Sequence, residues 1–106
     1  MVERRLTKFH IGIDLGGTKI EVAALNKTHD VIFRERVETG ANKGTEHILN
    51  QIFKAYQSAT QYIKNAAHSV GVGTPGSIST KSGLLRNSNT TCLNGLPLQK
   101  LIEKKL

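Results

Sequence analysis

Hydrophobic and polar residues alternate over the first third of the chain, as in β-strands that are buried on one face. The alternation covers residues 8–15, 18–25 and 31–38. Gly16-Gly17 separates the first two stretches, and a polar turn separates the second from the third. Because such short turns join neighbouring strands, the sequence predicts three strands in an antiparallel meander.

The pattern changes to a helical one in the middle of the chain. Apolar residues recur at spacings of three and four from Ile48 to Ala66, which predicts an amphipathic helix. Thr45 or Asn42 is expected to cap its first turn by accepting a hydrogen bond from a backbone N–H. The short apolar stretch from Ser69 to Gly73 then predicts a buried strand, which the helix returns alongside the meander.

The last third of the chain predicts a second hairpin and a final helix. Two β-compatible stretches lie within residues 77–86, on either side of Lys81-Ser82-Gly83. Apolar positions on one face between Leu96 and Leu106, with Pro97 near the start, are typical of a helix. The predicted class is therefore α/β, with a meander, a helix, a strand, a hairpin and a C-terminal helix.

Composition indicates one folded domain. The chain has 106 residues, of which 38% are hydrophobic and 22% charged, enough for one modest core and too few for a two-domain enzyme. Its apolar runs are shorter than the roughly 18 residues that span a bilayer, and its start lacks a signal-peptide pattern. We expect a cytoplasmic protein without a membrane partner. The single cysteine, Cys92, permits no intrachain disulfide.

The net charge of +7 raises the question of an anionic partner. The basic residues are spread along the chain, without the interleaved aromatic residues that stack on bases. Two interpretations stay open: a solvated surface, or a surface that meets an acidic protein segment or an anionic substrate. We do not expect a nucleic-acid partner.

The segment Asp14-Leu15-Gly16-Gly17-Thr18-Lys19 is the strongest chemical signal. Glycines without side chains let backbone N–H groups approach a phosphate, and the Thr18 hydroxyl adds a donor. Asp14 is placed to hold Mg²⁺, directly or through water. The alternative is a plain hairpin turn. The dinucleotide fingerprint and the P-loop are both excluded, because each needs a helix directly after the glycines.

Two further segments are candidates for ligand contact. GVGTPGS at 71–77 follows the predicted strand, and its glycines expose a backbone against which a ligand can lie. RNSNTT at 86–91 gathers uncharged donors and acceptors suited to a polyhydroxyl ligand. The alternatives are a structural turn for the first segment and a plain polar loop for the second.

Three stretches in this order resemble the N-terminal portion of the ROK family of sugar kinases. They are IGIDLGGTKIEVAAL at 11–25, GVGTPGSIS at 71–79 and GLLRNSNTTCLNGLPL at 83–98, and the last is most similar to the fructokinase branch. The resemblance implies the N-terminal domain of the actin-like ATPase (ribonuclease H-like) fold over residues 1–106, in a chain that lacks the C-terminal domain. It implies transfer of a phosphoryl group from MgATP to a hexose, with ATP and Mg²⁺ as cofactors, and a homodimer.

The resemblance also assigns roles to residues. The first phosphate loop, which binds the nucleotide, would comprise Asp14, Gly16, Gly17, Thr18 and Lys19, with Asp14 also holding Mg²⁺ through water. The residues toward the sugar would be Gly76, Ser77, Asn87 and Asn89.

This sequence departs from the family pattern in what it lacks. The catalytic aspartate of the family stands in an Asn-Asp pair, and no such pair occurs here. The zinc site of the family, a His with clustered Cys, is also absent, so Zn²⁺ would belong only to a longer protein. We therefore expect a fragment that is inactive alone. The alternative is a ROK-type transcriptional regulator that senses a sugar, although residues 1–7 are too few for a DNA-binding module before the first strand.

Overall fold

The computed structural model describes residues 8–74, 77–78, 82, 84–86 and 93–106. The strands are β1 (Phe9–Leu15), β2 (Lys19–Leu25), β3 (Val31–Glu38), β4 (His68–Gly73), β5 (Ser77–Ile78) and β6 (Leu85–Arg86). The helices are the 3₁₀-helix η1 (Ala41–Lys43) and the α-helices α1 (Thr45–Tyr62) and α2 (Leu98–Lys105). In the described part of the chain, no helix is long and apolar enough to cross a membrane.

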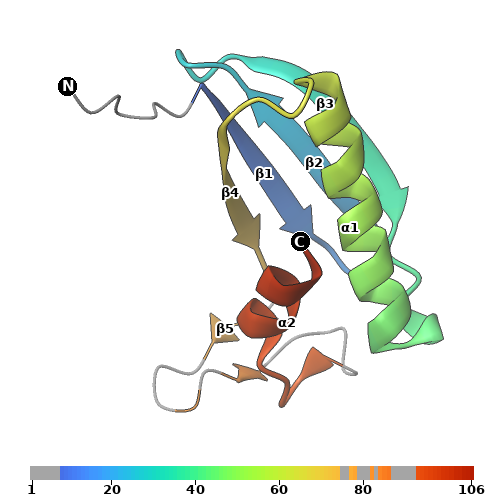
Figure 1. Cartoon of the computed structure of the whole chain (residues 1–106). Coiled ribbons are helices and arrows are strands. Elements are labelled where there is room, and N and C mark those ends of the chain that lie inside the picture. The colour runs from blue at the N-terminus through green and yellow to red at the C-terminus, as the bar shows by residue number, and fades with distance from the viewer. Residues whose placement is uncertain (1–7, 75–76, 79–81, 83, 87–92) are drawn as a thin grey trace.

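Four strands form one sheet in the order β3-β2-β1-β4 (Figure 1). β1 pairs with β2 and β2 with β3, both antiparallel, which confirms the predicted meander. β4 pairs with β1 in parallel, because α1 carries the chain back to the starting end of the sheet. The helix and the returning strand are thus arranged as the sequence predicts.

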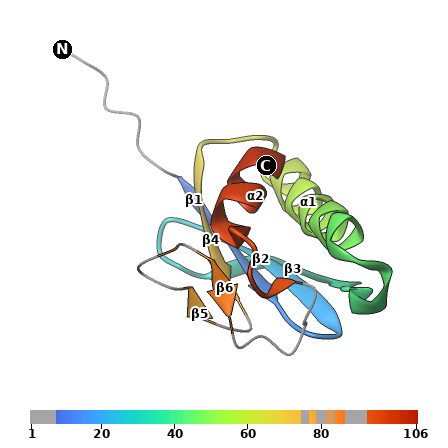
Figure 2. The same ribbon diagram turned by 90° about the horizontal axis from the view of Figure 1, so that it is seen from below.

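The core lies on one face of the sheet, and both α-helices cover that face (Figure 2). The alternation in β1 and β2 buries every second side chain against the helices and places Asp14 and Glu21 on the other face. Phe33 of β3 extends this face, with its ring stacked on Tyr62 of α1 at a centroid distance of 4.8 Å. The fully buried large side chains of the core are Ile11, Leu15, Ile20, Val22, Ile48, Ile52, Leu85, Leu93 and Leu98.

The prediction that Ser69–Gly73 forms a buried strand is half wrong. The strand exists as β4, but most of its residues are exposed, including Val70 at 41%. β4 stands at the edge of the sheet, so only its β1 side is paired. The apolar stretch therefore predicted the strand but not its exposure at the edge of the sheet.

Both ends of α1 differ from the prediction. The N-cap is Gly44, with φ of 95°, and no side chain caps the first turn, so neither Thr45 nor Asn42 has the expected role. The helix ends at Tyr62 instead of continuing to Ala66. It stops there because Lys64 and Asn65 adopt left-handed φ values of 56° and 58°, which no helix continues.

The second hairpin and the final helix are confirmed. β5 and β6 pair antiparallel, with Ser77 opposite Arg86, while the predicted turn around Lys81 and Gly83 lies outside the described residues. α2 follows Pro97 and packs against α1, burying Leu98 and Ile102. The hairpin and α2 extend the core past the end of β1, since Leu85 and Leu93 join the same cluster.

Candidate functional site

The glycine segment forms a tight hairpin turn at the end of β1. β1 ends at Leu15, which pairs with Ile20 of β2, and the Gly16 N–H donates to the Lys19 carbonyl at 3.0 Å. Gly17 and Thr18 form the tip, and among the described residues their N–H groups donate to no backbone carbonyl. A strand follows the glycines, as predicted, and two backbone N–H groups at the tip remain open to a ligand.

The two glycines serve the turn differently. A Cβ on Gly16 would stand 2.7 Å from the Lys19 carbonyl oxygen, closer than real Cβ atoms approach, so the hairpin closes only without a side chain there. A Cβ on Gly17 would meet nothing within 4 Å. Gly16 is therefore required by the turn itself, whereas the space beside Gly17 is open to an incoming group.

Thr39 fixes this turn, and sequence reasoning missed it. Thr39 follows β3 and is fully buried. Its N–H donates to the Thr18 carbonyl at 2.9 Å, and its hydroxyl donates to the Gly16 carbonyl at 2.8 Å. One signal was available in the sequence: Thr39 stands two positions after Val37, in the inward phase of the strand, where a buried hydroxyl needs an acceptor.

Asp14 lies one residue before the end of β1, with its side chain on the face opposite the core. It pairs with Glu21 of β2 and with Gly73 of β4. Its carboxylate is exposed, and within the described part of the chain it has no hydrogen-bond or ion-pair partner. A Cβ on Gly73 would lie 3.6 Å from Asp14 Oδ1, so the glycine keeps the flank of the carboxylate free.

Glu21 stands beside Asp14 in the same row across the sheet, and arginines neutralise it. Arg36 Nε donates to Glu21 Oε1 at 2.7 Å, and Arg34 Nε lies 3.4 Å from Oε2. The hydrogen bond from Arg36, with the charges of both arginines, holds the pKa of Glu21 below its ordinary value against a smaller opposing effect of desolvation. Because the charge of Glu21 is already compensated, Asp14 is the carboxylate in this row that is left to bind a cation.

The donor set around Asp14 fits Mg²⁺ better than a transition metal. Mg²⁺ is commonly held by one or two carboxylates together with water and substrate phosphates. No group of three or more His, Cys, Asp or Glu side chains in the described residues is arranged to hold a metal. A single open carboxylate next to free N–H groups suits a hydrated cation that arrives with an anionic ligand.

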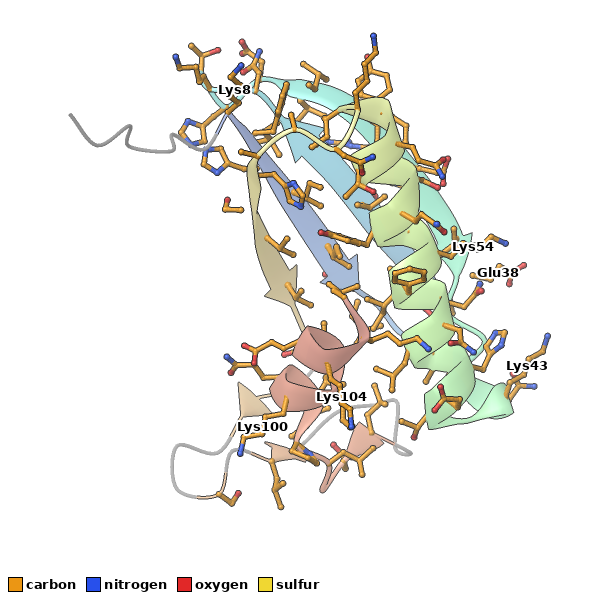
Figure 3. All side chains as sticks on the ribbon, in the orientation of Figure 1. Lys8, Glu38, Lys43, Lys54, Lys100 and Lys104 are labelled. Carbon is orange, nitrogen blue, oxygen red and sulfur yellow. The ribbon has the colours of Figure 1, made fainter. Side chains whose placement is uncertain are left out.

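Lys19 adds an exposed positive charge next to the turn. Its ammonium lies 4.0 Å from Glu38 Oε1, and both side chains are largely exposed. Figure 3 places Glu38 at the end of β3 beside α1, and it shows Lys8, Lys43, Lys100 and Lys104 at scattered positions, not in one patch. That spread agrees with the solvated-surface interpretation of the net charge. Since an exposed ion pair contributes little, Lys19 is free to turn toward an anion.

Most of the residues predicted to face a sugar lie outside the described residues. Gly76, Asn87 and Asn89 lie outside the described residues, as does Cys92, and only the backbone of Ser77 is described, in β5. A cavity of about 360 Å³ lies between β4 and α2, lined by Val70, Val72, Thr74, Gln99, Ile102, Glu103 and Leu106. Its valines lie on the face of the sheet opposite Asp14, so the cavity is separate from the glycine turn.

A family model described as "ROK family" matches residues 10–106. An N-acetyl-D-glucosamine kinase of Histophilus somni is 31% identical over 97 residues, which are 92% of this chain and 31% of that relative. The chain thus spans about a third of the length of the relatives it matches.

Solved structures show the same fold. A ROK family glucokinase from Streptomyces griseus, in complex with glucose and AMPPNP, superposes with a TM-score of 0.77 at 23% identity, over 92% of this chain and 30% of that one. A ROK family transcriptional regulator, a homologue of the E. coli MLC protein, gives 0.71 at 14% identity, over 95% and 26%. The predicted α/β fold of an actin-like ATPase N-terminal domain is therefore confirmed.

Proposed function

The chain belongs to the ROK family, and from this premise we propose that it supplies the first phosphate loop of a sugar kinase. In this proposal the parent protein transfers the γ-phosphoryl group of MgATP to a hydroxyl of a hexose. The observation that carries it is the pairing of an open glycine turn with a carboxylate that no described residue engages, two positions before that turn. Relatives and fold support the proposal, since two N-acetyl-D-glucosamine kinases are 31% and 33% identical to this chain over most of its length.

Each loop residue has a specific task in this proposal. The N–H groups of Gly17 and Thr18 donate to phosphate oxygens, and the exposed Lys19 ammonium adds positive charge. Asp14 would hold the water shell of Mg²⁺, and that ion would supply positive charge against the phosphates. Gly16 shapes the turn without donating, because its N–H is already bonded to Lys19. The loop thus contributes by position and charge, the main requirements of phosphoryl transfer.

The sugar is the least determined part of the proposal. Gly76, Ser77, Asn87 and Asn89 stay proposed sugar contacts. The loop RNSNTT favours fructose by its resemblance to fructokinases, whereas the similar relatives are N-acetyl-D-glucosamine kinases. The catalytic aspartate and any zinc site would lie in the remaining two thirds of a protein of that length, so the 106-residue chain alone should not turn over. A homodimer of the parent protein also stays a prediction.

A regulator is the second candidate function, because a ROK family transcriptional regulator shares this fold. Such a protein would use the same domain to sense a sugar and would need a DNA-binding module from another part of the chain. Gel-shift titrations at several salt concentrations would separate the two functions, since phosphate contacts to DNA weaken steeply with salt.

The kinase proposal is tested with MgAMPPNP and with a panel of sugars. In the 106-residue chain, amide NMR titration should show weak binding with shifts at Gly17 and Thr18, and Asp14→Asn should abolish its dependence on Mg²⁺. In the longer protein that we propose contains this chain, ADP release would be measured with fructose, N-acetylglucosamine, glucose and mannose. Asp14→Asn should lower kcat by about 100-fold or more. Full activity of that variant, or nucleotide shifts elsewhere in the chain, would overturn the proposal.

A further inference from the structure

Thr39 bonds to both sides of the glycine turn from a different part of the chain. Its hydroxyl donates to the Gly16 carbonyl and its N–H donates to the Thr18 carbonyl, so the bonds bracket Gly17. We propose that Thr39 is a positioning residue, which holds the N–H groups of Gly17 and Thr18 at the spacing that a phosphate requires. The structural part of this inference stands alone, while its effect on nucleotide binding rests on the proposed function.

The turn needs such a restraint because its own bonds do not hold its tip. Among the described residues, the hydrogen bond from the Gly16 N–H to the Lys19 carbonyl closes the hairpin. Gly17 has no side chain with which to pack. Glycine loses more conformational freedom on ordering than any other residue. Ordering an unrestrained tip would therefore cost entropy when an anion binds, and this cost would lower the affinity. The bond to the Gly16 carbonyl fixes the peptide plane that carries the Gly17 N–H. The bond to the Thr18 carbonyl fixes the Thr18–Lys19 peptide, so the peptide that carries the Thr18 N–H is held between two fixed planes.

Thr39 can act as a restraint because α1 holds the backbone on either side of it. The Gln51 side-chain amide donates to the Glu38 carbonyl at 2.7 Å, directly before Thr39. Directly after it, Gly40 adopts φ of 64°, and a Cβ there would stand 2.5 Å from His47 Nε2, so the histidine ring lies against the bare backbone. The first turns of α1 thus fix Glu38 and Gly40, and Thr39 transmits that fixed position to the glycine turn.

The burial of Thr39 separates this role from direct ligand contact. Its exposure is 0%, and both of its hydrogen-bond donors are occupied by the loop carbonyls. Thr39 therefore cannot touch a phosphate itself, and its removal should change the geometry of the donors without removing one.

The test compares Thr39→Val with Thr39→Ser and with Thr60→Val. Valine keeps the shape of threonine and its N–H but loses the hydroxyl, whereas serine keeps the hydroxyl. Thr60 is a matched control, because it is also buried, at 7%, and its hydroxyl donates to the Gln57 carbonyl at 3.0 Å, within α1. Amide order parameters of Gly17 and Thr18, exchange of the Gly16 N–H and MgAMPPNP affinity would be measured in the 106-residue chain.

The wild-type order parameter of Gly17 should be near the rigid value of about 0.85, and Thr39→Val should lower it toward about 0.6. Gly16 N–H exchange should accelerate by about 10-fold in Thr39→Val, and MgAMPPNP should bind about 10-fold more weakly. Thr39→Ser should restore all three quantities, and Thr60→Val should leave them unchanged whatever its melting temperature.

A mobile Gly17 in the wild type would overturn the inference without any variant, even if Thr39→Val failed to fold. An equal effect of Thr60→Val would also overturn it, because the loop would then respond to general loss of stability. If the loop loosens in Thr39→Val but neither the wild type nor any variant binds MgAMPPNP, the positioning role stands and the kinase proposal fails. If MgAMPPNP binds and Thr39→Val changes neither loop nor affinity, only the positioning role fails.

Discussion

Replacing each glycine of the turn by alanine separates what the hairpin needs from what a ligand needs. In Gly16→Ala the new Cβ would lie 2.7 Å from the Lys19 carbonyl oxygen, a backbone atom that cannot turn aside. The hairpin must open to relieve the contact, which lengthens the Gly16 N–H to Lys19 carbonyl bond of 3.0 Å. In Gly17→Ala the Cβ meets nothing within 4 Å, so the hairpin keeps its form.

The expected loss of stability in Gly16→Ala follows from three contributions. Steric strain of an added methyl group costs about 1–3 kcal/mol. A weakened hydrogen bond costs about 1 kcal/mol. Alanine restricts the unfolded chain and returns about 0.4–1 kcal/mol. The net destabilisation is about 2 kcal/mol, which corresponds to a fall in melting temperature of about 10 °C for a domain of this size.

Thermal and urea unfolding, followed by circular dichroism, would measure the stability of both variants. MgAMPPNP titration would measure how well the loop of each variant binds the nucleotide. Gly16→Ala should melt about 10 °C below the wild type. Gly17→Ala should melt about 2–5 °C above the wild type, because its position is open and alanine restricts the unfolded chain, while its MgAMPPNP affinity should fall. The reasoning is refuted if Gly16→Ala melts with the wild type, or if Gly17→Ala loses as much stability as Gly16→Ala.

Three further predictions concern the packing around the site. Arg36 lowers the pKa of Glu21 in the folded chain below the reference value of 4.5. The ionised Glu21 therefore stabilises the folded state fully above about pH 4.5, and this stabilisation is lost as the pH falls through the folded pKa. Glu21→Gln should therefore flatten the acid side of the unfolding free energy measured between about pH 3 and pH 6, and an unchanged slope would contradict this. Gly40→Ala should cost about 3 kcal/mol in urea unfolding, from its left-handed backbone and the contact with His47. His47→Ala in the same chain should recover about 1 kcal/mol, whereas strict additivity of the two changes would exclude the contact. Ile52→Ala, at a fully buried position of α1, should cost about 2–5 kcal/mol in the same assay, and a cost below about 1 kcal/mol would mean that the helix does not cover the sheet.

Local pattern was sufficient to predict most elements of the fold. Period-two alternation located the strands of the meander, and spacings of three and four located α1, since both patterns follow directly from backbone geometry. Element ends were less predictable. The end of α1 depends on left-handed Lys64 and Asn65, and its start on Gly44, none of which the apolar periodicity reports.

The candidate site was predictable only where it is contiguous in sequence. Asp14 and the two glycines lie next to one another along the chain, so residue type and spacing sufficed to pick them out. Thr39 is distant from them in sequence and reaches the turn because β3 ends beside the tip of the β1–β2 hairpin. Its partners are backbone carbonyls, which leave no trace in the side-chain pattern.

The sequence by itself determined the α/β order of elements, the glycine turn and the carboxylate before it, because these depend on neighbours along the chain. Only the tertiary structure decided that β4 stands at an edge, that Arg36 compensates Glu21 and thereby leaves Asp14 open, and that Thr39 holds the turn. Those features depend on strand order and register, which bring distant residues within hydrogen-bond distance. A pattern read along one chain gives the faces of its strands and the hairpin neighbours, but not the register between strands or which strand stands at an edge.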